Sequence, residues 1–137
     1  MLFSLESILL LWLIEKKEGW GIQVFHDGSV YEGWFKDNQF NRVGRLSNKN
    51  NDSYEGEFKN GEANGKGCYT YSDKTSLRGC WADNKIHGQG IETFPDGSNY
   101  KGDFVNGVKS GEGVYIFFKE NVSLFNKQCC FYFQPNY

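Results

Sequence analysis

The sequence lacks any excess of positive charge and contains very little histidine. Among its 137 residues, 15 Lys and Arg stand against 17 Asp and Glu, which gives a formal net charge of −2. Nucleic-acid-binding domains carry a clustered basic face, whereas the charged residues here mix both signs, so we expect no nucleic-acid partner. The two histidines, His26 and His87, fall at predicted turns without a consistent carboxylate or cysteine partner, and we expect neither to be catalytic.

The chain has four cysteines, and their spacing does not fit a metal site. Cys68 and Cys80 are too far apart for paired metal ligands, while Cys129 and Cys130 are adjacent. The sequence contains no Gly-rich phosphate loop and no pairing of a nucleophile with a base. A Gly-x-Gly motif is present, but it recurs throughout the chain, which indicates a structural role. We therefore expect no metal, no cofactor and no enzymatic activity.

The chain has no hydrophobic run long enough to span a membrane. Leu2 to Ile14 is almost entirely apolar, but a spanning helix needs about 20 apolar residues, and this run carries Glu6. It also lacks the basic start and the small-residue cleavage site of a signal peptide. Its leucine-rich composition favours a short apolar helix within residues 1–18, which Gly19 is well placed to terminate.

Three roles remain open for this N-terminal segment. A helix that is hydrophobic nearly all round needs burial on more than one side. We therefore favour a cap on the first strand pair or a helix that docks on a partner. A membrane-contacting anchor and a cleaved or incorrectly assigned start are the alternatives. The docking side chains would be Leu9, Leu10, Trp12 and Leu13.

What the sequence does contain is a repeat with a period of 23 residues. A Tyr-x-Gly motif begins at Tyr31, Tyr54 and Tyr100, and Leu77 occupies the remaining position. Four residues after each start lies an aromatic residue, namely Phe35, Phe58, Trp81 or Phe104. A Gly-x-Gly follows at the same interval, at Gly19/Gly21, Gly65/Gly67, Gly88/Gly90 and Gly111/Gly113, while Arg42 replaces the first glycine before Gly44. Self-similarity at a fixed period is the signature of a repeat architecture.

Each repeat predicts a β-hairpin. Apolar and polar residues alternate from Tyr54 to Lys59, as in a half-buried strand. Asn60-Gly61 follows, and Asn-Gly accepts the positive φ values that a tight hairpin turn requires. The corresponding pairs are Asp37-Asn38, Asp83-Asn84 and Asn106-Gly107. The connections are too short for crossover helices, so neighbouring strands must pair antiparallel, and successive hairpins should form one long sheet.

The glycines of the repeat have a predicted packing role. Glycine normally weakens a strand, but it allows a bulky neighbour to lie close over the backbone. We expect Tyr54, Phe58 and Tyr71, with the corresponding residues of the other repeats, to lie across Gly56 and Gly67. Such a ladder of rings would supply most of the burial that a single sheet needs.

These features resemble the MORN repeat. The resemblance is carried by residues 54–71, Tyr-Glu-Gly-Glu-Phe-Lys-Asn-Gly followed by Gly-x-Gly and a tyrosine, and by Tyr-Lys-Gly-Asp-Phe-Val-Asn-Gly at 100–107. It implies an elongated all-β array of hairpins that serves in protein contacts, dimerisation or membrane-adjacent scaffolding, with no chemistry of its own. The typical residues of the repeat are replaced at two places, residues 42–48 and 74–77. We expect the sheet to be less tightly packed at both places than in the rest of the array.

The predicted fold is therefore all-β, an open single-layer antiparallel sheet of consecutive hairpins with a short N-terminal apolar helix. The domains would be the helix at 1–18, the repeat array at 19–125 and an aromatic C-terminal tail at 126–137. We expect a non-catalytic scaffold that binds protein partners, in a cytoplasmic assembly associated with the cytoskeleton or a membrane. Membrane contact is allowed but not favoured, and a homodimer is compatible with the pattern.

Two alternatives to this function stay open, a lipid-binding or membrane-tethering module and a regulatory segment that acts with a lipid kinase or a methyltransferase. In the favoured interpretation, an aromatic face of the sheet binds the partner. Its residues would be Tyr31, Phe35, Tyr54, Phe58, Tyr71, Trp81, Phe94, Tyr100 and Phe104.

Overall fold

The computed structural model describes residues 16–118, and every regular element in this range is a β-strand. The strands are β1 (Gly19–Val24), β2 (Val30–Lys36), β3 (Gln39–Ser47), β4 (Ser53–Lys59), β5 (Glu62–Thr70), β6 (Ser76–Ala82), β7 (Lys85–Thr93), β8 (Asn99–Val105) and β9 (Val108–Ile116). The predicted N-terminal helix and the predicted C-terminal tail lie outside the described residues, apart from residues 16–18, which are not helical.

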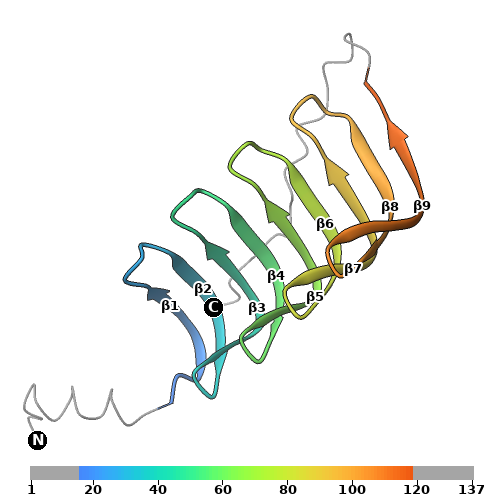
Figure 1. The fold of residues 1–137 in the computed structure, drawn as a ribbon. Coiled ribbons are helices and arrows are strands. Elements are labelled where there is room, and N and C mark those ends of the chain that lie inside the picture. The colour runs from blue at the N-terminus through green and yellow to red at the C-terminus, as the bar shows by residue number, and fades with distance from the viewer. Residues whose placement is uncertain (1–15, 119–137) are drawn as a thin grey trace, which may run out of the picture.

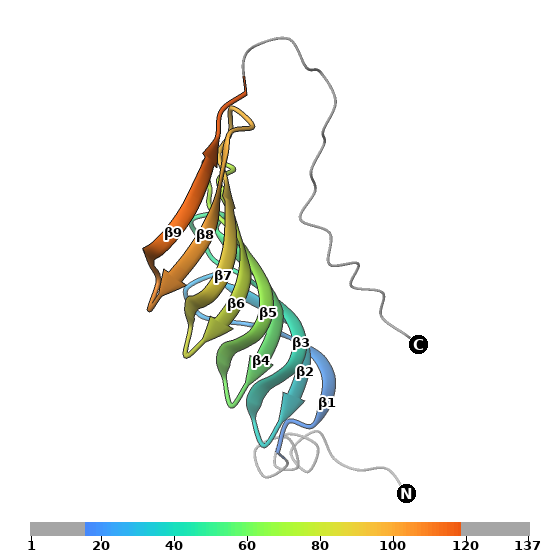
Figure 2. The same cartoon turned by 90° about the vertical axis from the view of Figure 1, so that its right-hand side faces the viewer.

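The nine strands form one open antiparallel sheet in which each strand pairs with its neighbours in sequence. Figure 1 shows the hairpins side by side along one direction, with each strand strongly curved. In the view turned by 90°, no second layer of strands covers the described part of the sheet (Figure 2). The all-β, single-layer prediction is therefore confirmed for this part of the chain.

The four predicted tight turns are confirmed. Both central residues of each turn have φ between 49° and 85°, the conformation of a type I′ hairpin turn. The same turns also join neighbouring hairpins, because the Gly61 N–H donates to the Phe40 carbonyl at 2.9 Å and the Gly107 N–H donates to the Ile86 carbonyl at 2.9 Å.

A continuous row of glycines crosses the whole sheet. Each of the eight strand pairs aligns one glycine with another, and the pairs share members from one strand to the next. The row consists of Gly21, Gly33, Gly44, Gly56, Gly67, Gly79, Gly90, Gly102 and Gly113. The sequence predicts glycines beneath rings within a repeat, and the register extends this arrangement over all nine strands.

The tyrosine that opens each complete repeat lies across two glycines of this row. A Cβ atom on Gly67 would overlap the ring and hydroxyl of Tyr54, and a Cβ on Gly56 would also contact that hydroxyl. The Tyr54 hydroxyl donates to the Glu57 carbonyl at 3.1 Å. Tyr31 and Tyr100 lie over their own glycine pairs in the same way. The ring-over-glycine prediction is confirmed for these tyrosines.

Phe58 and Tyr71, the other two rings in that prediction, have different neighbours. Phe58 packs edge-on against Tyr54, with the ring centroids 5.1 Å apart, and Tyr71 packs against Tyr69 at 4.7 Å. The atoms nearest to a Cβ on Gly67 all belong to Tyr54. Phe58 therefore packs on Tyr54, which already occupies the space above its glycines. Counterparts of Phe58 in other repeats do lie over the glycine row, because a Cβ would lie 2.9 Å from Phe104 at Gly90 and 3.5 Å from Phe35 at Gly21.

The repeat that begins at Leu77 fills the glycine row with a residue from the opposite strand. The side chains nearest to a Cβ on Gly79 or Gly90 do not include Leu77. Ile86 of β7, together with Phe104 of β8 at Gly90, takes the place of the tyrosine ring. Ile86 is only 1% exposed, and its Cδ1 would lie 3.0 Å from a Cβ on Gly79 and 2.6 Å from one on Gly90. The sequence analysis missed Ile86, because its role depends on the missing ring across the hairpin.

The two glycines of each Gly-x-Gly have different functions. The second lies in the glycine row, whereas the first adopts positive φ, between 61° and 110° at Gly65, Gly88 and Gly111. The register within each of these hairpins shifts beside the row, so the first glycine forms part of a β-bulge. Arg42 adopts the same conformation with φ 54°. Strand β3 is as long as β5, with nine residues in each. That the packing around residues 42–48 is looser than in the other repeats stays a prediction.

The C-terminal end of the core contains a cation instead of an apolar side chain. Lys109 occupies the repeat position of Phe40, Ala63 and Ile86. Its ammonium lies 4.5 Å from the centroid of the Tyr100 ring and 2.7 Å from Glu92 Oε2. The ammonium thus lies over the last core ring as a cation–π contact while it stays paired with Glu92.

The first prediction tests the ring over the glycine row. Gly67→Val is expected to lower the free energy of unfolding by about 1–3 kcal/mol, because the new side chain must displace Tyr54. Lys66→Val, at the exposed neighbouring position, is the matched control and should change it by less than about 0.5 kcal/mol. Thermal and urea denaturation of both variants measure the effect. Equal stabilities would contradict the packing role of Gly67.

The second prediction separates backbone conformation from crowding. Gly88 has φ +96°, and a Cβ there would meet nothing within 4 Å. Gly88→Val should still destabilise the protein by about 1–2 kcal/mol, since a left-handed backbone penalises L residues by that amount. Gly88→Asn should have a smaller effect, because asparagine tolerates this region. If valine and asparagine gave the same melting temperature, the requirement for positive φ would be wrong.

Candidate functional site

Seven of the nine aromatic residues predicted to bind a partner lie in the core of the sheet. Each has an exposed fraction of 8% or less; they are Tyr31, Phe35, Tyr54, Phe58, Trp81, Tyr100 and Phe104. They pack mainly edge to face, within a repeat and between repeats, as in the Tyr31–Phe58 pair with centroids 5.3 Å apart. Burial raises the pKa of the Tyr31 and Tyr54 hydroxyls well above the ordinary value.

The remaining two residues of that prediction are accessible. Tyr71 is 39% exposed, and Phe94, at the corresponding position one repeat later, is half-buried. These two side chains follow β5 and β7 at the end of the sheet opposite the type I′ turns. A partner approaching the folded sheet can therefore reach Tyr71 and Phe94, whereas the other seven rings are occupied by one another.

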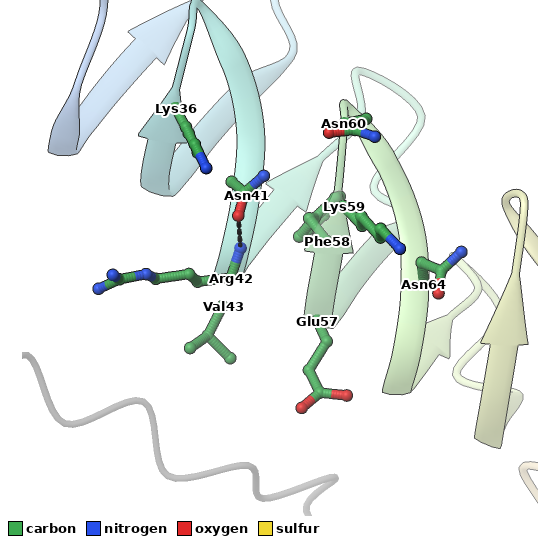
Figure 3. A pocket seen from close by; sticks show the side chains of 9 residues that line it. All are labelled: Lys36, Asn41, Arg42, Val43, Glu57, Phe58, Lys59, Asn60 and Asn64. Atoms are coloured by element: carbon green, nitrogen blue, oxygen red, sulfur yellow. Dashed lines mark hydrogen bonds between the residues drawn. The ribbon is translucent and has the colours of Figure 1, made fainter.

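A groove of about 580 Å³ lies near the type I′ turns, across β2 to β5. Its lining residues are Lys36, Asn41, Arg42, Val43, Glu57, Phe58, Lys59, Asn60 and Asn64 (Figure 3). The alternation of each strand places Lys36 and Lys59, the last residues of β2 and β4, out of phase with the buried rings. The groove is thus built mainly by the hairpin ends, and Phe58 is the one core ring in its lining.

The charged side chains of the groove are mainly basic. Figure 3 shows the Arg42 guanidinium and the Glu57 carboxylate pointing apart. Arg42 lies over the Trp34 ring, 5.0 Å from its centroid, and Glu57 Oε2 accepts a hydrogen bond from the Lys66 backbone N–H at 2.6 Å. The ion pairs within residues 16–118 involve neither Lys36 nor Lys59. Two exposed ammonium groups are consequently available to an anionic ligand.

Amide and apolar groups complete the lining. Asn41 Oδ1 accepts a hydrogen bond from the Arg42 N–H at 3.1 Å, which leaves its amide NH₂ free to donate. The side chains of Asn60 and Asn64 make no hydrogen bond within the described part of the chain. Phe58 is 5% exposed and Val43 is 38% exposed, so the groove also offers some apolar surface.

The sequence analysis missed this groove, although the repeat contained a signal for it. Lys36 and Lys59 are 23 residues apart and occupy the same repeat position, where the next two repeats have Ala82 and Val105. Alignment of the repeats shows that lysine occupies this position only in the first two of the four repeats. The two lysines line one groove because the strands curve. An alignment of the repeats does not show this curvature.

The structure offers no arrangement for metal binding within residues 16–118, where no three His, Cys, Asp or Glu side chains come together. His87 Nδ1 accepts a hydrogen bond from the Asn106 N–H at 3.4 Å, which joins a strand to the next turn. None of the described elements is a helix that could cross a membrane. The predicted docking residues Leu9, Leu10, Trp12 and Leu13 lie outside the described residues.

Comparison with known proteins agrees with the repeat geometry. No curated protein matches the sequence. Three consecutive MORN repeats match at residues 54–76, 78–99 and 100–122, and their boundaries follow the 23-residue period of the hairpins. The sheet extends the same hairpin unit upstream to β2 and β3, with β1 as a further single strand. The chain belongs to the MORN-repeat family.

Proposed function

We propose that this protein is a non-catalytic scaffold that binds protein partners. The observation that carries the proposal is the groove across β2 to β5, where two unpaired lysines and free asparagine amides lie on a sheet held by the glycine row. MORN repeats generally serve as interaction or membrane-binding modules, and an elongated sheet presents many side chains along one direction. Tyr71 and Phe94 supply a second accessible contact region.

The proposed setting is a larger cytoplasmic assembly next to the cytoskeleton or a membrane. A lipid-binding role is the second candidate, because the basic groove suits an anionic head group. Anionic membranes attract clusters of basic residues. The net charge of the whole chain is −2, so acidic side chains outside the groove oppose binding to such a membrane. A regulatory role beside a lipid kinase or a methyltransferase remains a further alternative, supported by the family resemblance.

The third prediction compares two charge-reversal variants in native extracts. Full-length protein with Lys36→Glu and Lys59→Glu is expected to lose specific partners that wild-type protein retains after quantitative affinity capture and mass spectrometry. The control, Lys101→Glu with Lys49→Glu, changes two exposed lysines that lie away from the groove, in β8 and in the β3–β4 connection. Partners lost equally from both variants would indicate general charge attraction and would contradict a groove-directed scaffold.

A vesicle assay separates the two candidate functions. Wild-type protein and both variants are mixed with vesicles that contain phosphatidylserine, and sedimentation measures the bound fraction at physiological salt. The scaffold proposal expects little binding by any of them. Strong binding that only Lys36→Glu with Lys59→Glu abolishes would favour the lipid-binding function instead.

A further inference from the structure

We infer that the groove across β2 to β5 binds an acidic, extended segment of the partner protein. This inference rests on the proposed scaffold function and names the chemistry of its ligand. Lys36 and Lys59 end two strands separated only by β3. Neighbouring strands lie about 4.7–4.9 Å apart, so the two lysines start roughly 10 Å apart along the sheet. Two acidic side chains of one extended segment can therefore each contact one of the two ammonium groups.

The charge balance of the groove favours an anionic ligand. Among the residues that line the groove, Lys36, Arg42 and Lys59 stand against one carboxylate, Glu57, which already accepts the Lys66 N–H. Asp37 beside Lys36 and Glu62 across the hairpin from Lys59 lie next to this lining, but neither forms an ion pair with these lysines. Arg42 is held against Trp34, while both lysines are exposed. A bound carboxylate would thus gain partners without breaking an existing ion pair within the described residues. The attraction should weaken with salt, because the screening length is about 10 Å at 0.1 M.

The uncharged lining favours a peptide over a simple anion. The amides of Asn41, Asn60 and Asn64 can donate to backbone carbonyls, and those of Asn60 and Asn64 can also accept backbone N–H groups. Val43, which is 38% exposed, provides apolar contact for a neighbouring side chain. A bare phosphate would leave these groups unused, whereas an extended peptide presents carboxylates, backbone amides and apolar side chains together.

The repeat also gives the segment a direction. The position of Lys36 and Lys59 becomes Ala82 at the end of β6 and Val105 at the end of β8, and Val105 is 46% exposed. A segment that runs along the array would meet positive charge over β2 and β4 and apolar side chains over β6 and β8. Its acidic residues should therefore lie at one end, followed by apolar residues.

The fourth prediction uses two fluorescein-labelled peptides and the full-length protein. One peptide has glutamates at one end and leucines at the other, and its twin replaces every glutamate by glutamine. Fluorescence anisotropy at about 0.1 M salt should show that the acidic peptide binds about tenfold more tightly, a factor consistent with two exposed ion pairs. Lys36→Gln with Lys59→Gln should weaken its binding about tenfold, to the level of the neutral twin.

The control is Lys101→Gln with Lys49→Gln, which removes the same charge from exposed positions away from the groove, in β8 and in the β3–β4 connection opposite the type I′ turns. Its affinity for the acidic peptide should stay within about twofold of wild type, since charges beyond the screening length contribute little. Both double variants should retain the wild-type melting temperature. Equal weakening by both double variants, or equal affinity for the two peptides, would overturn the inference.

The outcomes also distinguish this inference from the proposed scaffold function. If neither peptide binds but native partners still depend on Lys36 and Lys59, the scaffold function stands and the acidic segment is wrong. If phosphatidylserine vesicles bind through these lysines and the acidic peptide does not, the ligand is a lipid head group and the inference fails. If no native partner depends on the groove, the proposed function fails as well.

Discussion

The close contact between a tyrosine ring and bare glycine backbone is the constraint on which the rest of this structure depends. Each such ring covers two glycines on neighbouring strands, and the register links the glycines into one row across the sheet. A sheet ordinarily buries its apolar face against a second layer. Here the strands curve around their own rings, so that Tyr31 has no exposed surface although the described strands form a single layer.

This packing requires backbone features that recur with the ring. The β-bulges beside the glycine row bend the strands, and the first glycine of each Gly-x-Gly supplies the positive φ that the bulge needs. Where the repeat departs from its pattern, a neighbouring residue compensates. Ile86 and Phe104 fill the space above Gly90, and Lys109 places its ammonium over the ring of Tyr100. The repeats therefore share a filled space above their glycines, and different side chains can fill that space.

The same packing determines which residues remain for function. Because the core rings are occupied by one another, binding falls to side chains that the repeat leaves variable. The position after the core aromatic is lysine in two repeats, alanine in one and valine in one, and the groove lies at the two lysines. In an array of this kind the invariant positions provide a rigid support, and the variable positions determine charge and hence the chemistry of the partner.

The sequence by itself determined the period, the hairpins, the turns and the antiparallel order, because positive φ at Asn-Gly and a strict alternation of residues are local requirements. It also placed Tyr54 over Gly56 and Gly67. Only the tertiary structure decided that most of the predicted binding rings are buried, since burial depends on how far the sheet curves. Strand curvature and cross-strand register likewise brought Lys36 and Lys59 to one groove and Ile86 onto Gly90. These relations join residues of different strands, and a linear pattern does not contain the distances between them.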